Sequence, residues 1–326
     1  MRSETNQINM IGQNIAQAAE LLKRGEVIAI PTETVYGLAG NALDDHTVAK
    51  IFAIKQRPSF DPLIVHVPDW QSLENWVQNI PTAALQLAQQ FMPGALTLLL
   101  EKKETISDLV TAGSPLVAMR IPAHPLAQEL LRLLPFPLAA PSANPFGYIS
   151  PTRAEHVAQQ LGDKIPYILD GGPCTIGLES TIVGFPEGRT TIFRKGGIPV
   201  EAIEAVIGPV QVQAHSSSNP QAPGMLKSHY APRIPLVLGK LTELIPQHQG
   251  KVIGVLSFQE RYPEIPSERQ FALSSSGDYT EAARNLFSAM RYLDQLPLDL
   301  IVAELLPEEN LGRAINDRLR RASSKN

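Results

Sequence analysis

Two cations that could hold a phosphate chain stand at the predicted end of a helix. Lys55 and Arg57 lie two residues apart, directly before Pro58, and Asp61 follows shortly after. This spacing suits a polyphosphate, but cations at a helix C-terminus are also favoured by the helix dipole. The pattern therefore leaves a binding role and a structural role about equally open.

A histidine and an arginine interrupt two apolar segments that are typical of strands. His66 lies in the segment 63–67 and is expected to face away from the apolar side chains of that strand. A lone histidine there is more often structural than a ligand contact. Arg120 lies in the segment 117–121, and an unpaired buried guanidinium is costly, so either a structural or a substrate carboxylate should face it.

Clusters of neutral polar groups follow other apolar segments. The run Pro-Thr-Glu-Thr-Val-Tyr-Gly-Leu at 31–38 offers hydroxyls, a carboxylate and a phenol, although an ordinary turn explains it slightly better. Ser142, Asn144 and Ser150 precede a helix for which Thr152 and Glu155 predict a capping box at 152–155. Ser180 enters one strand, and Arg194 leaves another before two glycines, where an anion or a hairpin end fits nearly as well.

Composition excludes several classes of protein. The 326 residues carry a net charge of −4, which argues against a generic cationic nucleic-acid binder. The single cysteine, Cys174, allows no intrachain disulfide and no cysteine-built metal centre. No apolar run is long enough to span a membrane, and no secretory signal can be read, so we expect a cytoplasmic protein. Motifs of P-loop proteins, common dehydrogenases, zincins and α/β-hydrolases are absent.

The order of elements predicts an α/β protein with two folded parts. Residues 1–208 combine many strands with irregularly placed helices, which favours a large, curved, mixed sheet over a regular Rossmann unit. A segment rich in Ser, Pro and Gln predicts a linker at 209–233, and residues 234–326 predict a small parallel α/β domain. The expected strands are 27–30, 63–67, 96–100, 117–121, 167–169, 181–185, 190–194, 235–238, 252–258 and 300–305, and the expected helices are 14–24, 44–57, 82–91, 126–134, 153–161, 280–295 and 310–321.

Taken in order, these segments resemble the YrdC-like family of L-threonylcarbamoyladenylate synthases, in the long form with an additional C-terminal domain. The resemblance covers nearly the whole chain, and the ordered set of strings is far more specific than any one of them. The strings are PTETVYGL at 31–38, KQRP at 55–58, PLIVH at 62–66, PGALT at 93–97, MRIP at 119–122, APSAN at 140–144, ESTIV at 179–183, RKG at 194–196, APGMLKSHYAP at 222–232 and GRAINDRL at 312–319.

The resemblance implies an enzyme that joins L-threonine, bicarbonate and ATP into threonylcarbamoyl-AMP and pyrophosphate, for modification of the adenosine beside the tRNA anticodon. It implies a YrdC-like catalytic domain at 1–208, a lid at 209–233 and a small Rossmann-like domain at 234–326. The implied threonine site comprises Thr34, His66, Arg120, Ala140 and Ser180. The implied ATP site comprises Lys55, Arg57, Asp61, Ser142, Asn144, Ser150, Arg194 and Tyr230, with Lys55 and Arg57 also as catalytic cations.

The expected chemistry needs no covalent intermediate. A carbamate formed from threonine and bicarbonate would attack the α-phosphorus, with Mg²⁺ bound chiefly by the triphosphate and no metal site in the protein. His66 is treated as a substrate contact and not as a base. The family commonly has asparagine where this chain has Asp61, and the added negative charge is expected either to weaken ATP binding or to recruit Mg²⁺. Tyr230 or its neighbours are expected to gate the nucleotide.

Three other functions compete with this one. A non-catalytic RNA-binding module is disfavoured by the overall acidity and by the lack of interleaved aromatic residues. A carbamoyl-transfer role in hydrogenase maturation would require cysteine-rich zinc modules that one cysteine does not allow. A sensor that binds ATP and an amino acid without turnover can be distinguished from the synthase only by an activity assay. Beyond the small substrates, tRNA or tRNA-modification proteins are expected partners.

Overall fold

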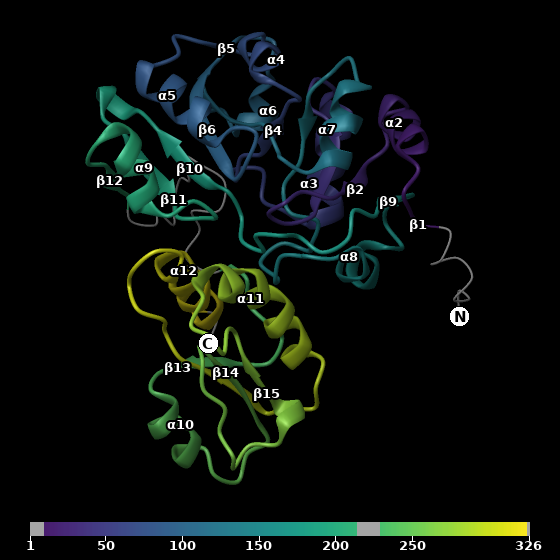
Figure 1. The fold of residues 1–326 in the computed structure, drawn as a ribbon. Coiled ribbons are helices and arrows are strands. Elements are labelled where there is room, and N and C mark those ends of the chain that lie inside the picture. The colour runs from purple at the N-terminus through teal and green to yellow at the C-terminus, as the bar shows by residue number, and fades with distance from the viewer. Residues whose placement is uncertain (1–9, 214–228, 325–326) are drawn as a thin grey trace.

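The computed structural model describes residues 10–213 and 229–324 and contains two sheets (Figure 1). Residues 214–228, which include most of the predicted linker with Lys227 and Ser228, lie outside the described residues, as do 1–9 and 325–326. In the described part of the chain, no helix is long and apolar enough to cross a membrane.

The described residues of the larger unit form a 12-stranded mixed sheet. Its strands follow the order β1-β9-β2-β3-β8-β4-β7-β6-β10-β11-β12, with β5 paired to β6. The sheet contains parallel pairs such as β4 with β7 and antiparallel pairs such as β6 with β7, which confirms the expected mixed sheet. The strands are β1 (Ile11–Gly12), β2 (Ile28–Ile30), β3 (Gly37–Asn41), β4 (Ile64–His66), β5 (Val77–Gln78), β6 (Leu96–Lys102), β7 (Leu116–Arg120), β8 (Leu138–Ala139), β9 (Ile168–Leu169), β10 (Thr181–Gly184), β11 (Thr191–Arg194) and β12 (Gln211–Val212).

Around this sheet, the helices at 15–23, 45–55, 82–91, 125–132 and 154–161 lie close to their expected positions, whereas those at 70–74, 108–111 and 200–207 were not predicted. In order, the helices are α2 (Ile15–Lys23), α3 (Asp45–Lys55), α4 (Trp70–Glu74), α5 (Thr82–Phe91), α6 (Asp108–Thr111), α7 (Pro125–Arg132), α8 (Ala154–Leu161) and α9 (Val200–Ile207), with a 3₁₀ turn η1 (Pro186–Gly188). Helix α3 begins after Asp44, whose carboxylate accepts a hydrogen bond from the His46 N–H, and ends before Gln56 in a left-handed conformation. That ending directs the following chain, with Arg57, back towards the sheet.

The prediction of a capping box at 152–155 is wrong. Helix α8 begins at Ala154, and Arg153 occupies the N-cap position without a side-chain hydrogen bond. The Thr152 hydroxyl lies 2.9 Å from the Ser288 hydroxyl of another helix, and the Thr152 N–H donates to His156 Nδ1 at 3.2 Å. A tertiary contact has therefore taken the hydroxyl that the local pattern assigned to the helix.

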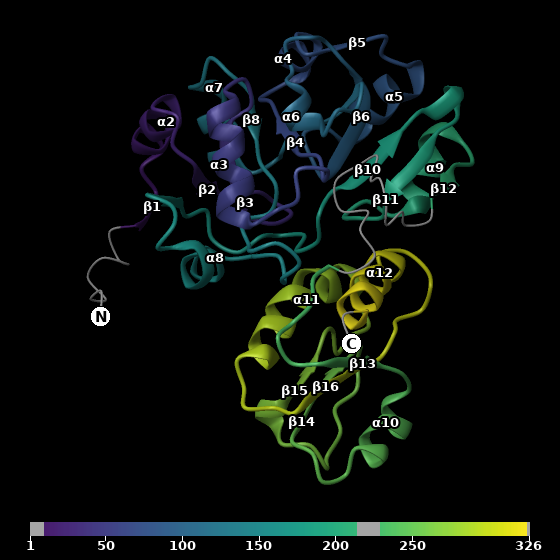
Figure 2. The same cartoon turned by 180° about the vertical axis from the view of Figure 1, so that it is seen from behind.

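The smaller unit contains a four-stranded parallel sheet in the order β13-β16-β14-β15, which confirms the expected parallel α/β part; strand β15 was not predicted. Its elements are β13 (Leu236–Leu238), α10 (Leu241–Gln247), β14 (Ile253–Ser257), η2 (Ser267–Arg269), β15 (Gln270–Ala272), α11 (Tyr279–Asp294), β16 (Leu300–Ala303) and α12 (Gly312–Ser323). Figures 1 and 2 show α11 and α12 between this sheet and the larger unit, with α10 on the far side.

One apolar cluster joins the two units. Leu178 and Ile149 of the larger unit and Tyr230 pack with Phe287 of α11 and Ile315 of α12. Gly177 completes the close approach, because a Cβ atom there would lie 2.5 Å from the α-carbon of Arg284. The units therefore share a buried interface, and that interface lies directly beside the polar segments that the sequence singled out.

Candidate active site

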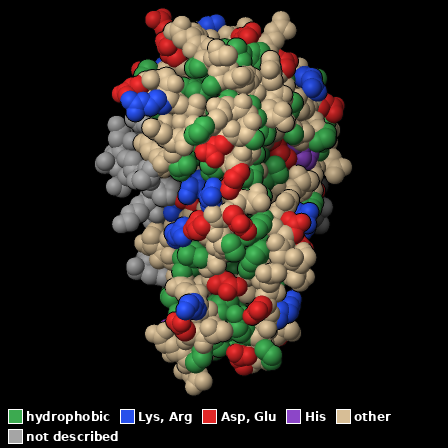
Figure 3. Space-filling view, turned by 60° about the vertical axis from the view of Figure 1, so that its left-hand side comes forward, with side chains coloured by type: hydrophobic (Ala, Val, Ile, Leu, Met, Phe, Trp, Pro, Cys, Tyr) green, Lys and Arg blue, Asp and Glu red, His purple; other side chains and the backbone are tan. Residues whose placement is uncertain are grey.

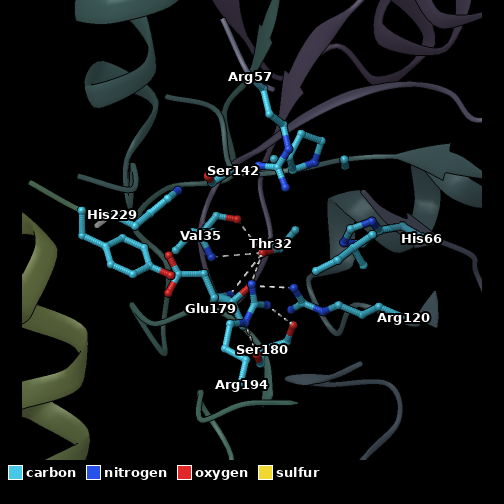
Figure 4. A pocket seen from close by; sticks show the side chains of 16 residues that line it. Thr32, Val35, Arg57, His66, Arg120, Ser142, Glu179, Ser180, Arg194 and His229 are labelled. Atoms are coloured by element: carbon cyan, nitrogen blue, oxygen red, sulfur yellow. Dashed lines mark hydrogen bonds between the residues drawn. The ribbon is translucent and has the colours of Figure 1, made fainter. Parts of the chain in front are cut away.

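A small cavity lies where the strand ends of the larger unit meet the end of the linker (Figure 4). Its volume is about 50 Å³, well below the ~300 Å³ at which ligand pockets usually begin. A ligand the size of a nucleotide would therefore require movement of the cavity walls. The lining residues are Thr32, Thr34, Val35, Gly37, Arg57, Ile64, His66, Arg120, Ala140, Pro141, Ser142, Glu179, Ser180, Arg194, His229 and Tyr230.

The five residues assigned to threonine by resemblance all line this cavity, namely Thr34, His66, Arg120, Ala140 and Ser180. The parallel pairing of β4 with β7 sets His66 beside Arg120. Antiparallel pairing of β6 with β7 then brings Arg120 beside Thr97, whose hydroxyl lies 2.7 Å from that of Ser180. Sheet register thus gathers residues that are far apart in the sequence.

Arg120 is held by protein groups on several sides. Its Nη2 forms an ion pair with Glu33 Oε1 at 2.7 Å, and its Nη1 donates to the Thr34 hydroxyl at 2.8 Å. Nε donates to the Gly94 carbonyl at 3.3 Å. A carboxylate of the protein, Glu33, therefore faces this arginine. The sequence had left open whether a structural or a substrate carboxylate would do so, and the structure shows the structural one. These contacts fix the plane of the guanidinium at the cavity wall.

His66 is a neutral, buried side chain. It points away from the core residues Leu63 and Val65 and into the cavity, as expected. Burial, with the nearby charge of Arg120, lowers its pKa to about 3, and its Nδ1 has no hydrogen-bond partner among the described residues. At neutral pH such an imidazole is a hydrogen-bonding contact and a poor proton acceptor.

The two cations of the 55–58 segment take different positions. Arg57 lines the cavity and forms a buried ion pair with Asp61 Oδ2 at 2.9 Å. Lys55 does not line it: its ammonium donates to the carbonyls of Ser142 and Asn144 at 2.5 and 2.6 Å. Burial holds the pKa of Lys55 well below its usual range. Lys55 therefore ties α3 to the 142–144 loop.

Three further residues of the expected ATP site stand just outside the cavity lining. Asp61 is fully buried against Arg57. The Asn144 amide donates to the carbonyls of Pro145 and Tyr148 at 2.8 and 2.9 Å. The Ser150 hydroxyl donates to Glu179 Oε1 at 2.6 Å. In this structure Asp61 therefore supports Arg57 and Ser150 supports Glu179 at the cavity wall, and the Asn144 amide bonds the backbone of its own loop.

Arg194 closes the other end of the cavity. Its Nε donates to the Ser180 carbonyl and its Nη2 to the Ser180 hydroxyl, both at 3.0 Å. Burial lowers its pKa to about 10, so the guanidinium stays charged at neutral pH. Figure 4 shows Arg194 and Arg120 at one end of the cavity and Arg57 at the other.

An aromatic group from the end of the linker covers one side. The His229 ring makes an edge contact with Phe146 and with Tyr230, at centroid distances of 5.7 and 4.3 Å. Tyr230 stacks on Phe287 of α11 at 5.4 Å. Burial lowers the pKa of His229 well below its usual range, so this ring is also neutral at neutral pH.

Sequence reasoning missed a cross-unit ion pair at the site. Glu179 lines the cavity, and its Oε2 accepts from Nε and Nη2 of Arg318 at 3.1 and 2.9 Å. The sequence did contain a signal for this pair, because Arg318 falls among the apolar positions Ala314, Ile315 and Leu319 of the expected helix.

The Tyr36 phenol, which the sequence analysis also singled out, lies outside the cavity lining and donates to the Gly172 carbonyl at 2.8 Å.

Fold and cavity together define a two-unit α/β protein whose larger unit holds a buried, arginine-lined site suited to a small anionic ligand. A family model of the Sua5, YciO and YrdC type, described as telomere recombination, matches residues 20–196. A second model, described as the C-terminal domain of threonylcarbamoyl-AMP synthase, matches residues 198–324.

Full-length relatives agree with both matches. Threonylcarbamoyl-AMP synthase of Bacillus subtilis is 42% identical over 330 residues, which cover 98% of this chain and 95% of the relative. That of Pyrococcus abyssi is 41% identical over 321 residues, covering 94% and 93%. The crystal structure of P. abyssi Sua5 complexed with L-threonine superposes with a TM-score of 0.90 at 40% identity, over 96% of this chain and 97% of that chain. The chain belongs to the threonylcarbamoyl-AMP synthase family, which confirms the resemblance drawn from the sequence.

Proposed function

We propose that this protein is a nucleotidyltransferase that converts L-threonine, bicarbonate and ATP into L-threonylcarbamoyladenylate and pyrophosphate. The observation that carries the proposal is the match of both units to threonylcarbamoyl-AMP synthases along nearly the whole chain. The cavity supports it independently, because three arginines, Arg57, Arg120 and Arg194, line a space bordered by hydroxyl groups.

Threonine is assigned to the part of the cavity formed by Thr34, His66, Arg120, Ala140 and Ser180. A guanidinium held by Glu33 is preoriented for a carboxylate, since its plane is fixed before the ligand arrives. Neutral His66 contributes a polar contact without a competing charge. The related P. abyssi structure was obtained with L-threonine, which supports this assignment without identifying the contacts in this chain.

ATP is assigned to Lys55, Arg57, Asp61, Ser142, Asn144, Ser150, Arg194 and Tyr230. Arg57 and Arg194 offer charge for the phosphates, and Ser142 offers a neutral donor. Lys55 would have to leave the Ser142 and Asn144 carbonyls to contact a phosphate, so its proposed catalytic role includes that exchange. Asp61 neutralises part of the charge of Arg57.

Mg²⁺ is proposed to enter with ATP, held chiefly by the triphosphate. Within the described part of the chain, no group of three or more His, Cys, Asp or Glu side chains could hold a metal ion. Glu179, a carboxylate at the cavity, already faces Arg318. These features fit a metal that accompanies the substrate, and bound Mg²⁺ would neutralise charge on the phosphates.

The reaction is proposed to begin with a carbamate formed from the threonine amine and bicarbonate, with loss of water. A carbamate oxygen then attacks the α-phosphorus in line, and the bond from that phosphorus to the bridging oxygen of pyrophosphate breaks. The protein contributes positioning and fixed positive charge. His66 is not assigned as a base, because its pKa of about 3 makes it a weak one.

The product points to partners that act on tRNA, and we include tRNA or tRNA-modification proteins and a cytoplasmic location in the proposal. A purely RNA-binding module is the weaker alternative. On the face in Figure 3, basic and acidic side chains are interspersed, without a broad basic area among the residues described there. The face shown there lacks the broad basic area that a general nucleic-acid binder presents.

Release of pyrophosphate from ATP tests the proposed reaction. Purified protein should release pyrophosphate only when L-threonine and bicarbonate are both present with Mg²⁺. Binding of ATP and threonine without release under any combination would favour the sensor function and refute the synthase.

A further inference from the structure

Helix α12 of the smaller unit sends one arginine into the wall of the active-site cavity. Arg318 is 0% exposed, yet it carries a charge that water would otherwise stabilise. Its guanidinium donates hydrogen bonds from Nε and Nη2 to Glu179 Oε2, at 3.1 and 2.9 Å. Its Nη1 donates to the Lys195 carbonyl and lies 3.3 Å from Asp317 Oδ2. Through the ion pair with Glu179, a charged side chain of the smaller unit contacts a residue that lines the cavity.

Glu179 needs this partner because it is a buried carboxylate at an anion site. It is 5% exposed, and its other oxygen accepts from the Ser150 hydroxyl at 2.6 Å. A buried charge that loses its partner is strongly unfavourable. In a cavity that must accept the phosphates of ATP, an uncompensated carboxylate would also repel the ligand directly.

Other contacts already hold the backbone of this segment. Gly177 packs against the backbone of α11, and Leu178 belongs to the apolar cluster shared by the two units. On the adjoining segment, Arg291 of α11 donates to the carbonyls of Ile149 and Ser150. Arg318 is therefore not the only structural tie, and its particular contribution is a positive charge that reaches across the interface to the Glu179 carboxylate.

We propose that Arg318 is a positioning residue of the ATP site: it neutralises Glu179 and fixes that carboxylate against Ser150, so that the cavity can accept a polyanion. The smaller unit thereby completes the electrostatics of a site that the larger unit builds. Arg318 also lies over the ring of Tyr230, 5.5 Å from its centroid, so the same charge borders the aromatic cover. This inference rests on the assignment of ATP to this cavity.

A double-mutant cycle separates charge compensation from mere packing. We expect Arg318→Met to raise the Kd for ATP by on the order of tenfold or more, because Glu179 loses its ion pair. Adding Glu179→Gln removes the orphaned charge, so the double variant should recover most of the lost affinity. A purely structural role predicts that the double variant binds no better than Arg318→Met. Arg320→Met is the matched control, since Arg320 is an exposed arginine on the same helix.

The readout is ATP binding by titration calorimetry on the full chain, with Kd for L-threonine and the melting temperature measured alongside. Unchanged ATP affinity in Arg318→Met, or a double variant that binds as poorly as the single one, would overturn the inference. If Arg318→Met does not fold, the double variant is compared with the wild type instead. The inference predicts that the double variant folds and binds ATP, and a double variant that does not bind ATP would overturn the inference. ATP binding does not depend on turnover, so the two proposals can fail separately. If the wild type binds ATP but releases no pyrophosphate, the proposed reaction is refuted and the role of Arg318 in binding is not.

Discussion

At the scale of single residues, the site depends on how each charged group is paired. Arg120 is set by Glu33 and Thr34, whereas Arg57 is set by Asp61 and by the Asp61 and Pro62 carbonyls. Each guanidinium is thus oriented before a ligand binds, which lowers the entropic cost of recognition. The two arginines are fixed by different contacts, so their substitutions should affect different substrates.

Arg120→Lys tests the assignment of the threonine carboxylate. Lysine keeps the charge but loses the planar fork, so the KM for L-threonine should rise by on the order of 10- to 100-fold. The KM for ATP should change much less. Steady-state kinetics with each substrate varied in turn give both values. A larger effect on ATP than on threonine would assign Arg120 to the nucleotide instead.

Burial of His66 predicts a loss of stability in acid. Its pKa is about 3 in the folded chain against 6.5 for an ordinary histidine, so the unfolded chain takes up the proton first as the pH falls. Stability from this group is complete above pH 6.5 and declines towards pH 3, by about 2 kcal/mol at pH 5. His66→Asn should therefore lose less stability than the wild type between pH 7.5 and pH 5 in urea unfolding. Equal losses would show that His66 does not drive the decline.

At the scale of elements, the longer apolar strands and the strongly periodic helices could be predicted, but most very short or glycine-rich strands and the helices α4, α6 and α9 could not. Strands β4 and β7 and helix α3 appear close to their expected ranges, since their periodicity is strong. Strand β3 reads Gly-Leu-Ala-Gly-Asn, a composition with low strand propensity. Gly40 is required by tertiary packing, because a Cβ there would lie 2.5 Å from Thr47 Cγ2. A single sequence does not reveal that contact.

Gly40→Ala tests this explanation of β3. The added methyl group should destabilise the protein by about 1–3 kcal/mol, because it overlaps the Thr47 methyl of α3. Thr47→Ser removes that methyl and keeps the hydroxyl, so the double variant should regain most of the stability. Denaturant unfolding measures each variant. No recovery on adding Thr47→Ser would place the strain elsewhere.

The cover formed by the end of the linker can be tested through Tyr230. Tyr230→Ala removes the ring that stacks on Phe287 and borders the cavity. Because aromatic contacts of this kind hold the cover in place, the KM for ATP should rise by on the order of tenfold. Release of the intermediate into solution should also be faster. Tyr292→Ala on α11, an exposed tyrosine, serves as the control; equal kinetics in both variants would argue against a gate.

At the scale of the whole molecule, the sequence predicts two α/β parts but not the way they meet. The change in composition before residue 234 indicates separate parts, and the boundary at 208 remains a prediction. The pairing of Arg318 with Glu179 joins residues 139 positions apart, and local spacing carries no information about such a contact. The same limit explains Lys55: its helix-end position was predictable, whereas its hydrogen bonds to Ser142 and Asn144 depend on the folded loop.

Direct detection of the product is the measurement that tests the central proposal most sharply. The full chain would be incubated with ATP, Mg²⁺, L-threonine and ¹³C-bicarbonate, and the quenched reaction analysed by mass spectrometry. We expect threonylcarbamoyl-AMP carrying the ¹³C label, formed in step with pyrophosphate and absent when threonine is omitted. Pyrophosphate or AMP without a labelled adenylate, or no turnover by protein that binds both substrates, would contradict the proposed function.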